Sequence, residues 1–449
     1  MKPLCFVLMP FGKKPDSSGR IIDFDDVYRS IIAPAIERAD LDPIRADEEG
    51  IGGSIHKPMF ERLMLCEYAV ADLTTGNANV FYELGIRHAV RPRSTTIIFC
   101  EGTYLPFDVA PLSGIPYRLD AADKAVSTIQ ERLIKCRQPN DDSPIYQLLD
   151  GIPRPEIDHT KADVFRDRVE YSKRCKARLF QARAKGEKGR EDILAFRREL
   201  GSLLDVESGV IVDIYLSLRA VNAFDEMLTL FNEMPEPLKR AKLIREQCAF
   251  ALTRLNRLDE AGAVLTEIIT ESGPNPETNG LLGRIYKDQW IIAQQAARSI
   301  PALGYLKKAI DVYLAGFEAD WRDAYPGVNA VALMEMVDPP DARQAIIFPV
   351  VRYAVQRRLA TSGGDYWDHA TLLELAVLAR DKDAAAVHLA DAAVQAKAPG
   401  RREAFAPKTT ARNLNLIREK RTKRGEDQNW VGEIERELEE IARDLEEGR

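Results

Sequence analysis

The segment VADLTTGNANVFYELGIRHAV, residues 70–90, decides the expected fold of the N-terminal part of the chain. Its first residues end a short apolar run that is typical of a buried strand, and Asp72 stands where that strand should stop. The turn-forming residues TTGN follow, and apolar residues then recur at helical spacing. The pattern predicts a strand, a tight loop and a helix that begins near Val80, with Asn77 or Asn79 as its capping residue.

Two carboxylates of this segment are candidate catalytic residues. We expect Glu83 in the first turn of the helix and Asp72 at the end of the strand, so both should face one crevice at the carboxyl edge of a parallel sheet, where open α/β folds bind ligands. Such a pair suits glycosyl chemistry, because one carboxylate can attack the anomeric carbon while the other orients the sugar or moves a proton. The alternative is structural, since an acid at a helix start complements the helix dipole.

Three separated motifs resemble the nucleoside 2-deoxyribosyltransferase-like superfamily, which includes nucleotide deoxyribohydrolases and is related in fold to TIR domains. These motifs are LCFVLMPFG at residues 4–12, DLT at 72–74 and NVFYELG at 79–85. The resemblance covers roughly the first third of the chain. It implies that Glu83 is the nucleophile and that Asp72 contacts the sugar or assists proton transfer.

The expected substrate pocket draws on further residues. The glycine-rich segment ADEEGIGGS at 46–54 lacks the Lys of a P-loop and the spacing of a dinucleotide fingerprint. Ser54 could still receive a phosphate at the N-terminus of the next helix. The other candidate substrate-binding residues are Phe11, Gly12, Asn79 and Tyr82. No cofactor and no metal ligand are predicted.

The first 150 residues alternate strand-like and helical patterns. Expected strands lie at 5–9, 41–45, 68–71, 95–100 and 117–119, and expected helices at 24–39, 55–66 and 125–136. This order predicts a parallel sheet covered on both faces, a flavodoxin- or Rossmann-like three-layer α/β domain over residues 1–150. Pro34 predicts a kink in the first helix, and the polar residues 13–20 predict a mobile loop.

Helical patterns follow one another from residue 155 to residue 396, after segments rich in Pro, Asp and Gly. Two expected hairpins, at 241–271 and 277–319, are spaced by roughly 34 residues, the tetratricopeptide period. The sequence therefore predicts an all-α, tetratricopeptide-like solenoid, although a full set of repeat-signature residues is absent and a plain helical bundle is the alternative.

Part of this helical region resembles the TRAF-binding central region of apoptosis signal-regulating kinases and its bacterial relatives. The resemblance rests on PETNGLLGRIYKD at 276–288, YLAGFE at 313–318 and YPGVN at 325–329, and spans about residues 160–390. It implies a solenoid used for regulation and protein contacts. Kinase activity is not implied, because the chain lacks the glycine loop and the HRD-type catalytic loop, and no eukaryotic TRAF partner is assumed.

Residues 397–449 are expected to form a charged linker and a C-terminal helix. The segment 399–427 is rich in Lys and Arg and reads as a linker or an exposed stretch. The segment 430–447 is acidic and carries an apolar stripe at helical spacing, which needs a partner in the solenoid or in a second subunit. A homo-oligomer is therefore one open alternative.

The composition limits the class of protein. The chain has 449 residues, 45% of them hydrophobic and 30% charged, as expected for a soluble globular protein of two or three domains. Its net charge of −7 gives no global reason to bind nucleic acid, and no apolar run is long enough to cross a membrane. Six scattered cysteines without a CxxC pair indicate reduced thiols in the cytoplasm and no zinc site.

These observations together predict a nucleotide N-glycosidase that is controlled by a protein partner of the helical solenoid. The two resemblances imply a role in stress or defence signalling. Two alternatives stay open, namely a non-catalytic signalling scaffold that binds a nucleotide and a TIR-like NAD hydrolase.

Overall fold

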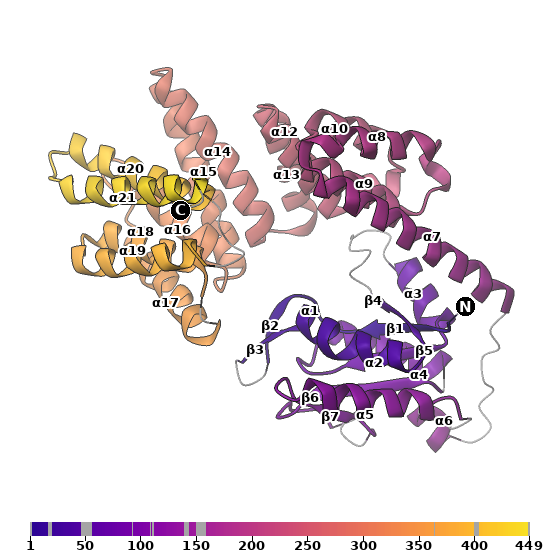
Figure 1. Cartoon of the computed structure of the whole chain (residues 1–449). Helices are drawn as coiled ribbons and strands as arrows, with labels where there is room; N and C mark the ends of the chain where they lie inside the picture. Colours follow the sequence, from indigo (N-terminus) through magenta and orange to yellow (C-terminus); the bar gives the residue numbers. More distant parts are fainter. Residues whose placement is uncertain are drawn as a thin grey trace. The chain divides into compact units, whose positions relative to one another are not determined.

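The computed structural model divides into two compact units, Met1–Ile244 (unit 1) and Arg245–Arg449 (unit 2) (Figure 1). It describes residues 2–16, 20–45, 56–91, 93–107, 109, 112–138, 143–149, 159–362, 364–398 and 404–447. Unit 1 contains a parallel sheet and helices, whereas the described part of unit 2 contains helices and no strand. The predicted order of an α/β part followed by a helical part is confirmed.

A five-stranded parallel sheet lies at the centre of unit 1. Its strands are β1 (Leu4–Leu8), β4 (Asp42–Arg45), β5 (Tyr68–Asp72), β6 (Thr95–Cys100) and β7 (Ile115–Tyr117). They lie in the order β4-β1-β5-β6-β7, and every neighbouring pair is parallel. All five residues of β1 are buried, as expected for the middle of a sheet with both faces covered.

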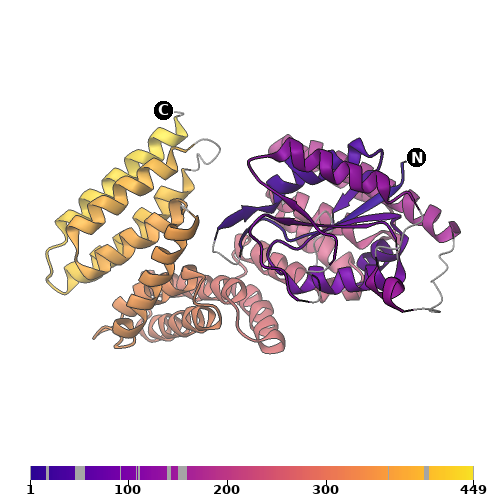
Figure 2. The ribbon, with the colours of Figure 1, turned by 90° about the horizontal axis from the view of Figure 1, so that it is seen from below.

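Alternate residues of β1 enter two separate apolar clusters, one on each face of the sheet. Cys5 and Val7 pack with the helices after β3 (Ile21–Asp23) and after β7, whereas Phe6 and Leu8 pack with the helices on either side of β5. These helices are α1 (Phe24–Val27), η1 (Tyr28–Ile32), α2 (Ala33–Arg38), α5 (Ala122–Lys135), α3 (His56–Leu65) and α4 (Ala78–Val90). Figure 2 shows the sheet close to edge-on, with helices above and below it.

The first helical segment departs from the expected single kinked helix. It consists of α1, the π-helical turn η1 and α2, and Pro34 lies in the first turn of α2. Proline lacks an N–H and its ring collides with the carbonyl group four residues earlier, so a widened turn ahead of Pro34 accommodates it.

The prediction of a mobile loop over residues 13–20 is wrong at its beginning. Residues Lys13–Pro15 form strand β2, which pairs antiparallel with β3 (Ile21–Asp23). Only Ile22 of the described β3 side chains is fully buried, so the hairpin has too little apolar patterning to be recognised in the sequence.

The helices that follow the sheet belong to unit 1. They are α6 (Pro144–Leu148), α7 (His159–Ala184), η3 (Gly186–Gly189), α8 (Arg190–Glu199), η4 (Leu203–Asp205), α9 (Ser208–Ala220), α10 (Phe224–Glu233) and α11 (Glu236–Lys239). Helix α7 is attached to the α/β part, because Lys173 Nζ lies 2.7 Å from Asp42 Oδ2 of β4 and Phe165 enters the cluster under α3 and α4. The domain boundary predicted near residue 150 therefore falls inside unit 1.

Unit 2 is built from paired helices. Helix α12 (Lys242–Arg254) begins at the unit boundary and is followed by α13 (Leu258–Ser272), α14 (Pro276–Gln295), α15 (Ser299–Ala319), α16 (Ala324–Glu335), α17 (Gln344–Ser362), α18 (Tyr366–Ala379), α19 (Lys382–Ala396), α20 (Phe405–Lys423) and α21 (Asn429–Glu446). The pairs α14–α15, α18–α19 and α20–α21 pack along their lengths. None of the described helices has the length and apolar character needed to cross a membrane.

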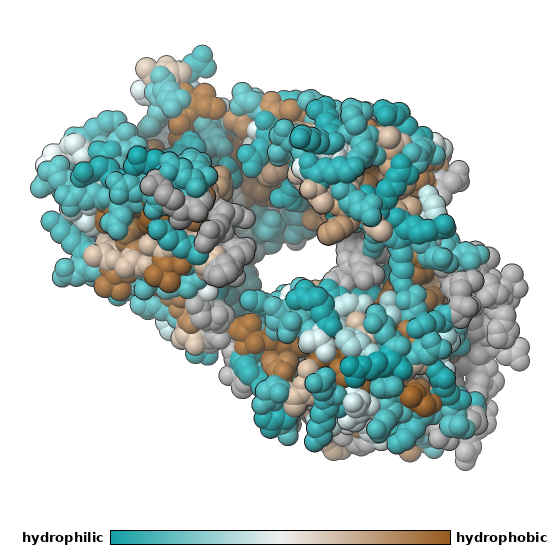
Figure 3. Space-filling model, in the orientation of Figure 1, coloured by the Kyte–Doolittle hydropathy of each residue, from teal (hydrophilic) through white to brown (hydrophobic). Residues whose placement is uncertain are grey.

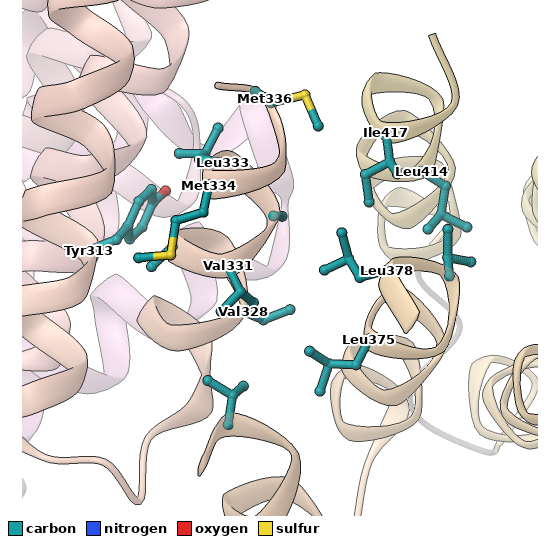
Figure 4. Close-up of a cluster of buried hydrophobic side chains, with 14 of the residues drawn as sticks. Tyr313, Val328, Val331, Leu333, Met334, Met336, Leu375, Leu378, Leu414 and Ile417 are labelled. Carbon is teal, nitrogen blue, oxygen red and sulfur yellow. The ribbon is translucent and has the colours of Figure 1, made fainter. Parts of the chain in front are cut away.

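Helix α16 is the central helix of unit 2. All its residues except Tyr325 are buried, including the apolar Val328 and Val331. In Figure 4 these side chains face Leu375 and Leu378 of α18, with Ile417 of α20 beyond them. A helix that is buried all round has no polar face, which explains why no amphipathic pattern predicted it.

Residues 405–423, which the sequence predicts as part of a charged linker, form α20. Its buried face includes Ala411, Leu414 and Ile417, so the segment is part of the core. The apolar stripe of α21, consisting of Val431, Ile434, Leu438, Ile441 and Leu445, is buried against α20 and α19. The stripe thus has its partner within unit 2 and does not require a second subunit.

Helix α14 packs closely on α15 at Gly283. We predict that Gly283→Ala destabilises unit 2. An added Cβ would lie 2.7 Å from the buried ring of Tyr313 on α15, and such overpacking costs about 1–3 kcal/mol. The matched control is Gly304→Ala, where a Cβ meets nothing within 4 Å. The higher helix propensity of alanine should stabilise this variant by as much as about 1 kcal/mol.

Tryptophan fluorescence during urea unfolding measures both variants, because all four tryptophans (Trp290, Trp321, Trp367 and Trp430) belong to unit 2. Equal unfolding midpoints for the two variants would contradict the packing argument.

Candidate functional site at the carboxyl edge of the sheet

The strand order places a reversal between β1 and β5. The chain runs from β1 to β4 on one side and then returns to β5 on the other. In open parallel sheets the loops that leave the two strands at such a reversal diverge, and ligands bind beside their carboxyl ends. Phe11 and Gly12 follow β1, and Asp72 ends β5, so three of the predicted site residues lie at this edge.

Asp72 lies in a buried hydrogen-bond network and is only 1% exposed. Its Oδ1 accepts hydrogen bonds from the backbone N–H of Thr74 at 3.0 Å and from the Thr74 hydroxyl, and its Oδ2 accepts one from Tyr117 Oη at 2.8 Å. The Thr74 hydroxyl also accepts a hydrogen bond from Cys100 N at 2.9 Å. The network fastens the ends of β5, β6 and β7 together, and burial raises the pKa of Asp72 to about 6.

Glu83 lies in the second turn of α4, so its predicted place in the first turn is wrong. The helix begins at Ala78, because the side chain of Asn77 caps it by accepting hydrogen bonds from the N–H groups of Asn79 and Val80. The Glu83 side chain is partly buried and makes no hydrogen bond or ion pair with any residue that the structure describes. Burial raises its pKa to about 7, which is the range in which a carboxyl group can exchange a proton at neutral pH.

The loop after β1 packs around Arg45, the last residue of β4. The guanidinium group lies 5.4 Å from the ring centroid of Phe11 and 4.6 Å from that of Tyr28, and Nη2 donates to Asp25 Oδ1 at 2.8 Å. The N–H of Gly12 donates to the same Asp25 oxygen at 3.5 Å, and Gly12 adopts a φ of 63° that favours glycine. Arg45 was missed in the sequence, where the only signal was a cation at the end of an expected strand.

The remaining predicted site residues do not all lie with these groups. Asn79 and Tyr82 are exposed residues of α4, and Ser54 lies outside the described residues. Two side-chain groups are thus defined at the edge, one around Arg45 and one around Asp72. The convergence of Asp72 and Glu83 on one pocket stays a prediction.

We predict that unit 1 loses stability as the pH rises, because the buried Asp72 must give up its proton. The folded state holds the Asp72 proton more tightly than the unfolded chain does, so this contribution is fully present below the unfolded pKa of 3.8 and is lost by about pH 6. The raised pKa corresponds to about 3 kcal/mol. Asp72→Asn keeps an acceptor for Thr74 and should remove this dependence.

Hydrogen exchange of the β5, β6 and β7 amides between pH 4 and about pH 7 would measure the effect. Asp26→Asn, which changes an exposed carboxylate of the same unit, should leave the pH dependence of wild type unchanged. The network explanation fails if Asp72→Asn has the same slope as wild type.

The fold defines the class of this protein. It has an α/β domain with a parallel sheet whose strand order reverses between β1 and β5, and paired helices follow in the chain. The family model of the MAP3K TRAFs-binding domain matches residues 80–435. The chain therefore belongs to the MAP3K TRAFs-binding domain family. The predicted resemblance of the helical region is confirmed, and the match extends beyond the expected residues 160–390, from within α4 to within α21.

Two kinds of solved structure show a distant likeness. A thermophilic TPR protein of Thermus thermophilus is 16% identical, with a TM-score of 0.34, and the match covers 46% of this chain and 100% of that chain. Human IFIT1, as a dimer with PPP-AAAA, is 14% identical, with a TM-score of 0.38, and the match covers 73% of this chain and 80% of that chain. The comparison with curated proteins found no match. Likeness at this level carries no argument about ligands.

Proposed function

We propose that this chain is a nucleotide N-glycosidase of the deoxyribohydrolase kind, controlled by a protein partner of its helical unit. The observation that carries the proposal is Glu83, a partly buried carboxylate without a described partner and with a pKa of about 7. It lies on the helix that leaves β5, beside the reversal of a strand order like that of the doubly wound, three-layer flavodoxin fold. Groups with perturbed pKa values at such edges are typical of functional sites.

In the proposed reaction the ionised Glu83 attacks the anomeric carbon of the sugar. The bond from that carbon to the base breaks, the base leaves with the electron pair and takes up a proton from water, and a glycosyl ester of Glu83 forms. Water then hydrolyses this ester and releases the sugar phosphate. The predicted set of Phe11, Gly12, Asn79 and Tyr82 would border the substrate, and the guanidinium group of Arg45 lies 5.4 Å from the ring centroid of Phe11.

The role that we propose for Asp72 differs from direct sugar contact. Both of its oxygens accept hydrogen bonds within the protein, and the side chain has almost no exposed surface. It therefore acts as a positioning residue, because it holds the loop that begins at Leu73 and thereby the start of α4, on which Glu83 lies.

The proposed control by a protein partner is supported by an exposed apolar stripe on α17. Ile346, Val350 and Tyr353 are exposed at helical spacing, and the exposed ring of Trp321 lies 6.4 Å from that of Tyr353, measured between centroids. Aromatic and aliphatic side chains of this kind are typical anchors in protein interfaces, and Figure 3 shows apolar surface, in brown, among the polar surface of the helices. The family name points to the same kind of partner, a protein.

The experiment is a substrate screen with the purified full chain. Deoxynucleoside monophosphates, ribonucleotides and NAD are incubated separately, and released base or nicotinamide is measured by chromatography. Release of a base from a deoxynucleotide supports the proposal. Release of nicotinamide from NAD alone supports a TIR-like NAD hydrolase instead, and no release from any substrate overturns the enzymatic proposal unless addition of a protein partner restores it.

A second candidate function is a non-catalytic signalling scaffold that binds a nucleotide. The burial of Asp72 favours it, because a carboxylate with both oxygens bonded internally serves the fold without reacting. Binding of a nucleotide monophosphate in calorimetry without any release of base would select this function.

A further inference from the structure

Two histidines and an aspartate of the α18–α19 hairpin gather at one place in unit 2. His369 lies on α18, and His388 and Asp391 lie one turn apart on α19. One ligand atom from each side chain can be chosen so that all three lie within 4.8 Å of one another. His369 Nδ1 lies 3.5 Å from Asp391 Oδ2.

Each imidazole ring presents a buried nitrogen that forms no hydrogen bond with the described residues, and the nitrogen of His369 has only the 3.5 Å approach of Asp391. The Nδ1 atoms of His369 and His388 are shielded from solvent and form no hydrogen bond. A buried polar atom without a partner is costly, so native proteins leave few of them without a reason. The carboxylate of Asp391 lies beside them and is 48% exposed. A cation bound among the three side chains would satisfy these nitrogens.

We propose that His369, His388 and Asp391 bind a divalent transition-metal ion of the zinc class. Two imidazoles and a carboxylate are ligands that Zn²⁺ binds readily. Mg²⁺ and Ca²⁺ prefer oxygen ligands, so the two imidazole nitrogens select against them. Zinc bonds of about 2.0–2.1 Å place tetrahedral donors about 3.4 Å apart. The His369–Asp391 approach of 3.5 Å already has this spacing, and the half-exposed Asp391 can rotate to adjust its own distances to the two imidazole rings.

The proposed site would be open to further ligands. Three protein ligands leave a fourth position of a tetrahedral ion for water or a small molecule, as in catalytic rather than closed structural zinc sites. His388 also lines a small cavity with Arg352 and Asp381. The positive charge of Arg352 and the negative charge of Asp381 offset each other. The negative charge that attracts a cation to the site is therefore that of Asp391.

The consequence for unit 2 is a cross-link between two helices. Helices α18 and α19 already pack along their lengths, and an ion held by one residue of α18 and two of α19 would stabilise that pairing by mass action. No local sequence pattern indicates this site, since His369 and His388 are far apart in sequence and no cysteine accompanies them.

The test is zinc binding by the full chain after treatment with a chelator. Calorimetry with ZnCl₂ should show a site that loses more than about 10-fold in affinity in His388→Gln and in Asp391→Asn, since even changes behind the ligands cost about 10- to 100-fold. Asp383→Asn removes an exposed carboxylate of the same helix and should bind zinc like wild type. Co²⁺ should give visible absorption without the intense bands of thiolate ligation, which excludes the free cysteines.

A stability measurement separates loss of the site from loss of the fold. In the presence of chelator the partly exposed Asp391→Asn variant should unfold at the temperature of wild type, and zinc should raise that temperature only in wild type and in Asp383→Asn. No zinc binding, or equal binding by wild type and the ligand variants, overturns the proposal.

Discussion

Glu83→Gln should lower the rate of base release from a deoxynucleotide on the order of 10⁴-fold, as is typical when a group that reacts with the substrate is removed. Glutamine has nearly the same shape as glutamate, but its amide cannot form the glycosyl ester. Because Glu83 makes no hydrogen bond or ion pair with the described residues, the substitution breaks no described contact. The rate of base release at saturating substrate measures the loss.

The pH profile distinguishes two roles for Glu83. A nucleophile must be ionised, so kcat/KM should rise with pH through about 7, the pKa of the free carboxyl group, and then level off. A group that donates its proton to the leaving base would give the opposite profile, a fall above about pH 7. Glutamine does not titrate, so any residual activity of Glu83→Gln should show neither the rise nor the fall of kcat/KM near pH 7.

The matched control is Glu37→Gln, which changes an exposed glutamate of α2 in the same unit. It should keep the rate and the pH profile of wild type. If wild type and Glu83→Gln release equal amounts of base, the ester mechanism is wrong, and nucleotide binding by both proteins would then leave the scaffold as the function of the α/β domain.

Local sequence patterns were sufficient for most of the α/β fold. The run TTIIFC was predicted as a strand at residues 95–100, and β6 has these bounds, because four apolar residues with two β-branched neighbours fit a buried central strand. Asn77 was one of two predicted caps, and it forms the cap. The helix start lay two residues earlier than expected, which moved Glu83 from the first turn into the second.

The partners of the site residues could not be read from local patterns. Tyr117 reaches Asp72 across β6, and Arg45 reaches Phe11 across the β4–β1 pair, so both contacts depend on strand order. The pair His369 and His388 likewise meets only through the packing of α18 on α19. Spacing within one element predicts a shared face, but contacts between elements require the tertiary fold.

The basic run of α20 shows how a charge pattern misleads. A segment rich in Lys and Arg is usually a solvated face, yet the side chain of Arg421 is 0% exposed. Its Nε donates to Glu335 Oε1 of α16 at 2.9 Å, and its two other nitrogens donate to the carbonyls of Val377 and Leu378 at 2.8 Å each. The partner carboxylate is 86 positions away in sequence, beyond the reach of any local pattern.

Arg421→Met should destabilise unit 2 by about 3–5 kcal/mol, the usual effect of breaking a buried ion pair by removing one partner. The side chain of Glu335 is only 5% exposed, so its charge would lose the buried cation while it keeps the more exposed Arg424, whose Nη1 lies at 3.1 Å. The carbonyls at the end of α18 would lose their donors as well.

Urea unfolding followed by tryptophan fluorescence measures the loss of stability. The control is Arg412→Met, at an exposed position of the same helix, which should change stability by less than about 0.5 kcal/mol.

The double variant Arg421→Met with Glu335→Gln separates the two causes of this loss. If the weakened pairing of the buried Glu335 charge causes most of the loss, neutralising Glu335 should recover about half or more of the lost stability, because replacing both members of a buried pair is far less costly than removing one. If the double variant is as unstable as Arg421→Met alone, the hydrogen bonds to the α18 carbonyls carry the effect. Arg421 would then stabilise the helical unit chiefly as a cap on α18, through its hydrogen bonds to the carbonyls of Val377 and Leu378.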